Sequence, residues 1–313
     1  TASGPLSGQK CTASACLSGA EYIALDGSAK RQKGAAGSSS RNRATGCSSH
    51  INDEFFDAPR ADNGYLTVTA PKLQIVHEDE NILLVDKRPG LAVHPHDGAE
   101  YGKTLIDHIQ AYLYAKHEWN PRAEHSFAPA LCNRIDRNTG GIVIAAKNAE
   151  ALRIMNQKIK DHELTKQYLC IVHGTPKPKD GTLRGYLFKD AVKNRVFITK
   201  TPQKGSKTAV THYRTLHSQR GLSLLECTLE TGRTHQIRAM LAEAGHPLLG
   251  DGKYGRLDKR YDRKFQALYA YRLRFDFTTD AGILSGLNGR MFTVKAVPLL
   301  WRNIFGISLS ELL

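Results

Sequence analysis

The segment A-L-C-N-R-I-D-R-N-T-G-G-I-V-I-A-A-K, residues 130–147, decides the predicted fold. Its second half, residues 141–147, is a short apolar run rich in β-branched side chains, which predicts a buried strand rather than a helix. The first half is a polar turn in which Asp136 lies between Arg134 and Arg137. Aspartates that only accept backbone hydrogen bonds are common in turns, so this segment alone favours a structural role for Asp136.

The composition indicates a basic protein that is long enough to bury a full hydrophobic core. The 313 residues can form one large domain or two ordinary ones. The 44 lysine and arginine residues exceed the 30 acidic residues, which gives a formal net charge of +14 at pH 7. These cations are spread along the whole chain, a distribution that suits a protein holding a polyanion across a broad face. Charge alone does not separate a nucleic acid from an anionic membrane surface.

The sequence carries no signal for membrane insertion or secretion. It has no window of about 18 apolar residues and no visible signal peptide, so we expect no membrane partner. The opening T-A-S-G-P-L lacks an initiating methionine, and we therefore expect a fragment or a processed product. Cys132, Cys170 and Cys227 fall inside or beside predicted strands, where thiols act as small apolar residues, and this favours a reducing cytoplasm.

The remaining cysteines leave a metal site open as an alternative. Cys11, Cys16 and Cys47 together with His50 offer four ligands of the kind that zinc takes. The long linker between them and their featureless flanks argue against this site, so we expect no metal. The sequence also has no G-x-G-x-x-G motif, no phosphate loop and no internal repeat, and we expect no nucleotide cofactor.

Composition divides the chain into three parts. Residues 1–48 are rich in Ser, Gly, Ala, Lys and Arg, which predicts a basic and mostly disordered appendage. Residues 49–71 contain an alternating pattern at 65–68 that predicts a short strand, followed by a linker. The main domain is predicted to cover residues 72–313.

Helical and strand patterns follow one another irregularly in the main domain. Thr104 can cap one amphipathic helix and Asn148 can cap a second. The order of strand-rich, helical and again strand-rich regions predicts an α+β fold rather than a regular βαβ alternation. Apolar runs predict a hairpin over residues 75–85 and strands over residues 141–147, 166–172, 195–199, 209–215, 222–230, 267–277 and 292–294.

A strand-to-helix junction at residues 229–238, L-E-T-G-R-T-H-Q-I-R, is the second unusual feature of the sequence. It brings Arg233, His235, Gln236 and Arg238 to the start of a predicted helix, where free backbone N–H groups favour anions. A phosphate-binding site is one interpretation of this junction. A helix start that is held by salt bridges is the other.

Tyr168 also has two interpretations. The strand predicted over residues 166–172 places Tyr168 and Cys170 on the same face. A half-buried tyrosine usually packs against a neighbouring strand, whereas a phenol that faces a cleft can stack on a nucleobase.

Three segments, taken together and in this order, resemble the RluA-type family of RNA pseudouridine synthases. They are N-R-I-D-R-N-T-G-G at residues 133–141, K-Q-Y at residues 166–168 and G-R-T-H-Q-I-R at residues 232–238. The resemblance implies a pseudouridine synthase fold, with a mixed and largely antiparallel central sheet flanked by helices and loops. A catalytic cleft is expected to run across this sheet.

The resemblance extends over about residues 72–300, because residues 82–94 and 245–255 also fit the family pattern. Two positions depart from it. Ile135 stands where the family usually has Leu, and Gly140 stands where it usually has Ser, which removes a hydroxyl near the catalytic loop.

The resemblance implies an isomerase that flips a uridine out of structured RNA and converts it to pseudouridine, without a cofactor. Large-subunit ribosomal RNA is the expected substrate, ahead of transfer RNA, and a cytoplasmic monomer is the expected form. Asp136 would attack the uridine at the sugar or the base, Tyr168 would stack on the uracil and act as a base, and Arg238 would pair with Asp136. The residues implied to lie around the RNA are Arg134, Arg137, Arg233, His235, Gln236, Lys87 and Arg88.

Many relatives carry an additional N-terminal RNA-binding module. Residues 50–57, H-I-N-D-E-F-F-D, resemble the end of that module, so residues 49–71 are expected to be its remnant. This loss and Gly140 motivate a second hypothesis, an RNA-binding or ribosome-assembly protein with little catalysis. A glycosidase with paired carboxylates fits poorly, because Asp136 alone has the required surroundings.

Overall fold

The computed structural model describes residues 64–95, 102–123, 126–190, 195–255, 257, 259–261, 264–297 and 304–306. All of them belong to the unit Phe56–Leu313. The appendage predicted over residues 1–48, the alternative zinc ligands within it and near it, and most of the predicted module remnant lie outside the described residues.

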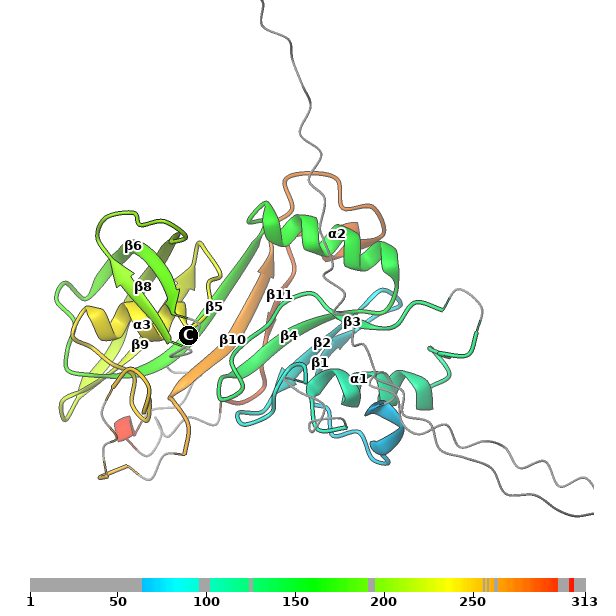
Figure 1. Ribbon diagram of the computed structural model, residues 1–313, viewed down its shortest axis with the longest axis horizontal. Helices are drawn as coiled ribbons and strands as arrows, with labels where there is room; N and C mark the ends of the chain where they lie inside the picture. Colours follow the sequence, from blue (N-terminus) through cyan, green and yellow to red (C-terminus); the bar gives the residue numbers. More distant parts are fainter. Residues whose placement is uncertain are drawn as a thin grey trace, which may run out of the picture. The chain divides into compact units, whose positions relative to one another are not determined.

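The described residues form one eleven-stranded sheet with three α-helices (Figure 1). The strands are β1 (Ile75–Glu78), β2 (Ile82–Lys87), β3 (Ala130–Leu131), β4 (Gly140–Ala146), β5 (Leu164–His173), β6 (Asp180–Asp190), β7 (Arg195–Thr199), β8 (Lys207–Gln219), β9 (Leu222–Leu229), β10 (Leu268–Phe275) and β11 (Met291–Thr293). The helices are α1 (Leu105–Ala115), α2 (Ala149–Lys160) and α3 (Gln236–Glu243), with short 3-10 helices at Gly64–Thr67 and Gly282–Leu287.

The strand order is β1-β2-β4-β10-β5-β9-β8-β6-β7, with β3 paired to β4 and β11 paired to β10. Every pair is antiparallel except β4 with β10, which is parallel. The predicted α+β class with a mixed, largely antiparallel sheet is therefore confirmed. The parallel pair matters for function because it puts the start of β4, just after Asp136, in the middle of the sheet.

The two helix caps were predicted correctly. The backbone N–H and the hydroxyl of Thr104 both donate to Asp107 Oδ2, at 3.0 and 2.5 Å, and this capping box starts α1. The side chain of Asn148 accepts from Ala151 N at 2.8 Å and starts α2. No helix in the described ranges is long and apolar enough to span a bilayer.

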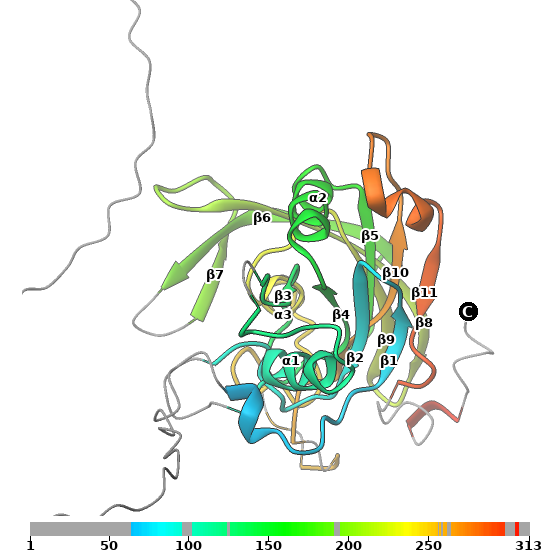
Figure 2. The ribbon, with the colours of Figure 1, turned by 90° about the vertical axis from the view of Figure 1, so that its right-hand side faces the viewer.

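The sheet carries apolar side chains on both faces. Along β5, Leu169 and Ile171 enter one hydrophobic cluster together with residues of α2, while Tyr168 and Cys170 enter a second cluster with residues of α1 and α3. This alternation confirms the predicted facing of the strand. All seven residues of β4 are buried, as the apolar run predicted. Figure 2 shows α1 and α3 beside the strands, and α3 is the helix that brings Arg238 to the sheet.

The strand predicted at residues 65–68 is wrong, because this segment is a 3-10 helix. The hydroxyl of Thr67 donates to the carbonyl of Gly64 at 2.7 Å, which closes a local turn. The ring of Tyr65 packs edge-on against Trp119, with 4.9 Å between the centroids. A tertiary aromatic contact and a local hydrogen bond therefore override the alternating pattern.

The sequence analysis missed β6, whose polar and glycine-containing sequence looks like a loop. Two glycines of β6 lie where the neighbouring strands leave no room for a side chain. A Cβ at Gly181 would lie 2.9 Å from the ring of Tyr213, and a Cβ at Gly185 would lie 2.7 Å from Ile198 Cγ2. These glycines mark close contacts with neighbouring strands rather than turns.

Lys87 was predicted to contact RNA, and its burial disfavours this role. Its side chain is 1% exposed, and Nζ donates to the carbonyls of Arg88, Leu91 and Arg137 at 3.1, 2.7 and 2.9 Å. All three of its donors are therefore used inside the protein. Lys87 ties the segment after β2 to residues 132–139, which we call the Asp136 loop. The backbone N–H of Gly90 donates to the same Arg137 carbonyl at 2.9 Å.

Gly140 has a structural explanation on the neighbouring strand. Its register partner on β10 is Tyr269, and a Cβ at residue 140 would lie 2.2 Å from that ring. The Tyr269 hydroxyl donates to buried Asp86 at 2.7 Å, which holds the ring in this place, and burial raises the pKa of Asp86 to about 6. A serine at residue 140 would require the Tyr269 ring to move.

We predict that Gly140→Ala lowers the free energy of unfolding by about 1–3 kcal/mol, because the added methyl group overlaps the Tyr269 ring. Urea unfolding followed by circular dichroism measures the effect. Gly286→Ala is the matched control, since nothing lies within 4 Å of a Cβ placed there. An equal effect of both substitutions would show that the Tyr269 ring is not fixed over Gly140.

We predict a pH-dependent stability contribution from Lys87. Burial lowers its pKa to about 7, whereas the ordinary value in an unfolded chain is about 10.4. The unfolded state therefore binds more protons between about pH 7 and 10, and the free energy of unfolding rises with pH by at most about 1.4 kcal/mol per unit. Urea unfolding should show this rise in the wild type and lose it in Lys87→Met. Exposed Lys103→Met is the control, and parallel curves for wild type and Lys87→Met would refute the assignment.

Candidate active site

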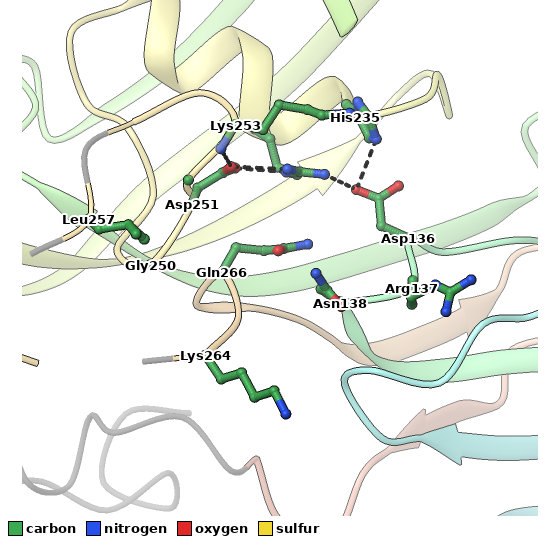
Figure 3. Close-up of a pocket in the computed structure, with 12 residues that line it drawn as sticks. Asp136, Arg137, Asn138, His235, Gly250, Asp251, Lys253, Leu257, Lys264 and Gln266 are labelled. Carbon is green, nitrogen blue, oxygen red and sulfur yellow. Dashed lines mark hydrogen bonds and ion pairs between the residues drawn. The ribbon is translucent and has the colours of Figure 1, made fainter. Parts of the chain in front are cut away.

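An ion pair joins two segments that are 102 residues apart in the sequence. Arg238 Nη1, on α3, donates to Asp136 Oδ2 at 2.7 Å, so the pairing expected from the resemblance is present. Figure 3 labels Asp136 together with the neighbouring His235 and Asp251. The Asp136 side chain is 23% exposed and that of Arg238 is 8% exposed. Asp136 Oδ1 has no hydrogen-bond partner among the described residues. One carboxylate oxygen is therefore held by the guanidinium, whereas the other makes no such contact in the described part of the chain.

A second carboxylate fixes the arginine. Asp251, which is 1% exposed, accepts from Arg238 Nε at 2.7 Å and from Nη2 at 2.9 Å. The same carboxylate accepts from the backbone N–H groups of Lys253 and Tyr254 at 3.0 and 3.2 Å. Burial disfavours both charges, but the hydrogen bonds between the partners raise the pKa of Arg238 and lower that of Asp251. Arg238 is thus a preoriented bridge between two carboxylates.

Sequence reasoning missed Asp251. In the sequence, the segment at residues 245–255 shows only a fit to the family pattern. The available signal was Asp251 followed by Gly252, because an aspartate side chain in a turn commonly accepts backbone hydrogen bonds. Nothing in the sequence indicated that its carboxylate faces a guanidinium on α3.

Local hydrogen bonds set the shape of the Asp136 loop. Asn133 Oδ1 accepts from Ile144 N at 2.8 Å, so the loop is attached to β4 at its start. Thr139 N donates to the Asp136 carbonyl at 3.0 Å, which closes the turn directly after the carboxylate. The hydroxyl of Thr139 accepts from Gln266 at 3.3 Å. The loop is therefore anchored on both sides of Asp136.

Gln236 was predicted to contact RNA, and its buried, hydrogen-bonded position disfavours this although it borders the small hollow at Tyr168. The residue is 3% exposed. Its amide nitrogen donates to the Val210 carbonyl and to Thr211 Oγ1, both at 2.9 Å. Its amide oxygen accepts from Thr231 Oγ1 at 2.8 Å and from Arg233 N at 3.0 Å. All its donors and both its lone pairs are used, so Gln236 fixes the start of α3 against β8.

Tyr168 lies on the same face of the sheet as the ion pair. It is 8% exposed and lines a small hollow of about 60 Å³ together with Asp136, Ile135 and Leu268. Burial, with a contribution from the charge of Asp136, raises the pKa of Tyr168 above its ordinary value. The phenol is consequently neutral at neutral pH.

His235 stands at the start of α3 with a left-handed backbone, φ 54°. This conformation is uncommon for a residue with a side chain, and histidine is one of the residue types that tolerate it. The ring lies beside Asp136, with 3.8 Å from Nε2 to Oδ2, and Nδ1 lies 2.9 Å from the Tyr254 hydroxyl. Burial lowers the pKa of His235, which favours the neutral imidazole.

A cavity of about 460 Å³ also borders the ion pair. Its size is within the range of small-molecule sites. Asp136, His235 and Arg238 border both the cavity and the small hollow. The cations at the cavity are Arg137, Lys253 and Lys264, and those at the hollow are Arg134 and Arg233.

The structure thus brings together most of the residues that were predicted for the site. The predicted residues that border one or both spaces are Asp136, Tyr168, Arg238, His235, Gln236, Arg134, Arg137 and Arg233. Arg88 is exposed and borders neither of them. In the part of the chain that the structure describes, no three His, Cys, Asp or Glu residues group as metal ligands do.

Comparisons with known proteins identify the family. The family model described as RNA pseudouridylate synthase matches residues 81–243. The chain is 37% identical over 204 residues to the uncharacterized RNA pseudouridine synthase YlyB of Bacillus subtilis, covering 65% of this chain and 64% of that protein. It is 34% identical over 224 residues to ribosomal large subunit pseudouridine synthase D of Zymomonas mobilis, covering 72% of this chain and 68% of that protein.

Solved structures extend the comparison to the fold. Human RNA pseudouridylate synthase domain containing 4 is similar with a TM-score of 0.57 at 20% identity. The similarity covers 75% of this chain and 93% of that one, and at this identity it concerns the fold alone. With the family model matching more than half of the chain, the protein belongs to the RNA pseudouridine synthases, a family of isomerases.

Proposed function

We propose that the protein converts uridine to pseudouridine in structured RNA, with large-subunit ribosomal RNA as substrate and Asp136 as the nucleophile. The observation that carries this proposal is the Asp136–Arg238 ion pair at the border of a cavity lined by cations. Similarity to a ribosomal large subunit pseudouridine synthase D supports the choice of RNA.

The reaction needs a nucleophile that can be released again. Asp136 Oδ1 attacks either the anomeric carbon of the sugar or the uracil ring, and the bond from uracil N1 to the sugar breaks. The uracil turns, a bond forms between its C5 and the sugar, C5 loses its proton, and N1 gains one. No electrons are gained or lost overall, so the isomerisation is redox-neutral.

Arg238 supports this step through its charge. One of its N–H groups holds Asp136 Oδ2, which aims the free Oδ1 while the charge of the carboxylate is balanced. Because Asp251 binds two further N–H groups of the same guanidinium, the arginine cannot turn away from the nucleophile without breaking a buried pair.

The cations around the two spaces suit the phosphates on either side of a flipped nucleotide. Arg134 and Arg233 are exposed at the hollow, and Arg137 is exposed at the cavity. Guanidinium groups bind phosphate oxygens through paired N–H donors. We therefore assign these three arginines to the RNA backbone.

Tyr168 is assigned to stacking on the uracil. Its raised pKa keeps the phenol protonated, which disfavours the other role implied by the resemblance, that of a base. The hollow beside Tyr168 has a volume of about 60 Å³, so we expect this space to widen when a uridine enters.

One of the two arguments for the alternative hypothesis, an RNA-binding or ribosome-assembly protein with little catalysis, is weakened by the structure. Gly140 raised that alternative because the family usually has serine there. In this protein the space of a side chain at residue 140 is filled by the ring of Tyr269. The side chain that is missing at Gly140 is thus replaced by the packing of Tyr269, and the Asp136–Arg238 pair is present.

We predict that Asp136→Asn lowers the reaction rate by at least about 10³-fold, as expected when a nucleophile is removed. The measurement is tritium release from uracil C5 in large-subunit ribosomal RNA from a strain that lacks such enzymes. Exposed Asp161→Asn, at the end of α2, is the control and should retain full activity. Equal release by wild type and Asp136→Asn would exclude the proposed nucleophile.

A further inference from the structure

Tyr254 joins the catalytic ion pair to a distant strand. Its hydroxyl accepts from Val196 N, on β7, at 2.9 Å and lies 2.9 Å from His235 Nδ1. The guanidinium carbon of Arg238 is 5.1 Å from the centroid of its ring, and that of Arg195 is 5.0 Å away. One side chain therefore touches both residues that flank Asp136 and also the start of β7.

The hydrogen bonds of the phenol point to one placement of its proton. Val196 N–H can only donate, so the phenol oxygen is the acceptor in that bond. The single O–H proton of Tyr254 is then free to be donated to His235 Nδ1. A neutral imidazole that accepts at Nδ1 carries its own proton on Nε2.

The Nε2–H group of this tautomer faces the nucleophile, because Nε2 lies 3.8 Å from Asp136 Oδ2. The other charged groups that act on His235 come from three segments. Asp136 and Asp251 favour its charged form, whereas Arg238 and Lys253 disfavour it, and burial acts in the same direction as the cations. The neutral imidazole thus offers a dipole, rather than a full charge, to the carboxylate.

We propose that Tyr254 is a positioning residue that fixes the Nε2–H tautomer of His235 beside Asp136 and holds Arg238 in place. Through Val196 and Arg195 the same side chain links the catalytic ion pair to the β6–β7 hairpin. The part that concerns activity rests on the proposed function, whereas the tautomer can be measured without it.

The tautomer is tested by two-bond ¹H–¹⁵N NMR spectra of protein labelled with ¹⁵N-histidine, with His235→Gln to assign the signal. The wild type should show His235 protonated at Nε2 alone at neutral pH. Tyr254→Phe keeps the ring and removes the donor to Nδ1, so protonation at Nδ1 should appear. A wild-type ring protonated at Nδ1, or an unchanged pattern in Tyr254→Phe, would overturn the proposal.

The positioning role is tested by tritium release from the same ribosomal RNA. Tyr254→Phe should lower kcat about tenfold, the usual effect of one lost hydrogen bond, with little change in KM. Tyr213→Phe is the matched control, because it also removes one phenol hydroxyl, which donates to the Pro178 carbonyl at 3.0 Å away from the site. An unchanged kcat, or a loss in KM alone, would overturn the positioning role.

The two readouts separate the possible failures. Thermal unfolding of each variant shows whether Tyr254→Phe is folded, and Tyr254→Leu, which removes the ring as well, should lower kcat further. If the wild type releases no tritium, the proposed function fails, while the NMR spectra still decide the tautomer.

Discussion

The structure depends on one buried arginine that is shared by two carboxylates. The Arg238 side chain is 8% exposed, and a guanidinium at that depth must be paired to offset its lost hydration. Asp251 takes two of its N–H groups and Asp136 takes a third. The α3 helix, the segment after it and the Asp136 loop are therefore held around a single charge, and the supporting contacts of Lys87 and Gln236 fix the segments on which these groups stand.

Much of this arrangement could be predicted from the sequence, because the signals involved are local. The apolar run at residues 141–147 became β4, and the caps at Thr104 and Asn148 start the helices as expected. The facing of Tyr168 followed from strand alternation. The pairing of Asp136 with Arg238 could not be predicted in this way, because the residues alone favoured a structural turn and only the family resemblance implied the pairing.

What could not be predicted depends on burial created by contacts between distant segments. Lys87 resembles a surface cation in the sequence, but its partners include a carbonyl 50 residues away. In the sequence Gln236 resembles a residue that contacts RNA, but in the structure β8 supplies the acceptors for its amide. The departure at Gly140 is explained only by Tyr269, which the fold places beside it in register. The contact of Asp251 with Arg238 could not be predicted, because it depends on the orientation of α3. No pattern within a single element specifies that orientation.

The central claim is that Asp251 acts on the nucleophile through Arg238, and a double-mutant cycle tests it most directly. The kcat for tritium release is measured for wild type, Asp251→Asn, Arg238→Lys and the double variant. If the claim holds, Asp251→Asn lowers kcat in the wild-type background and has almost no further effect once Arg238 is lysine. Independent, additive losses in the two backgrounds would contradict it.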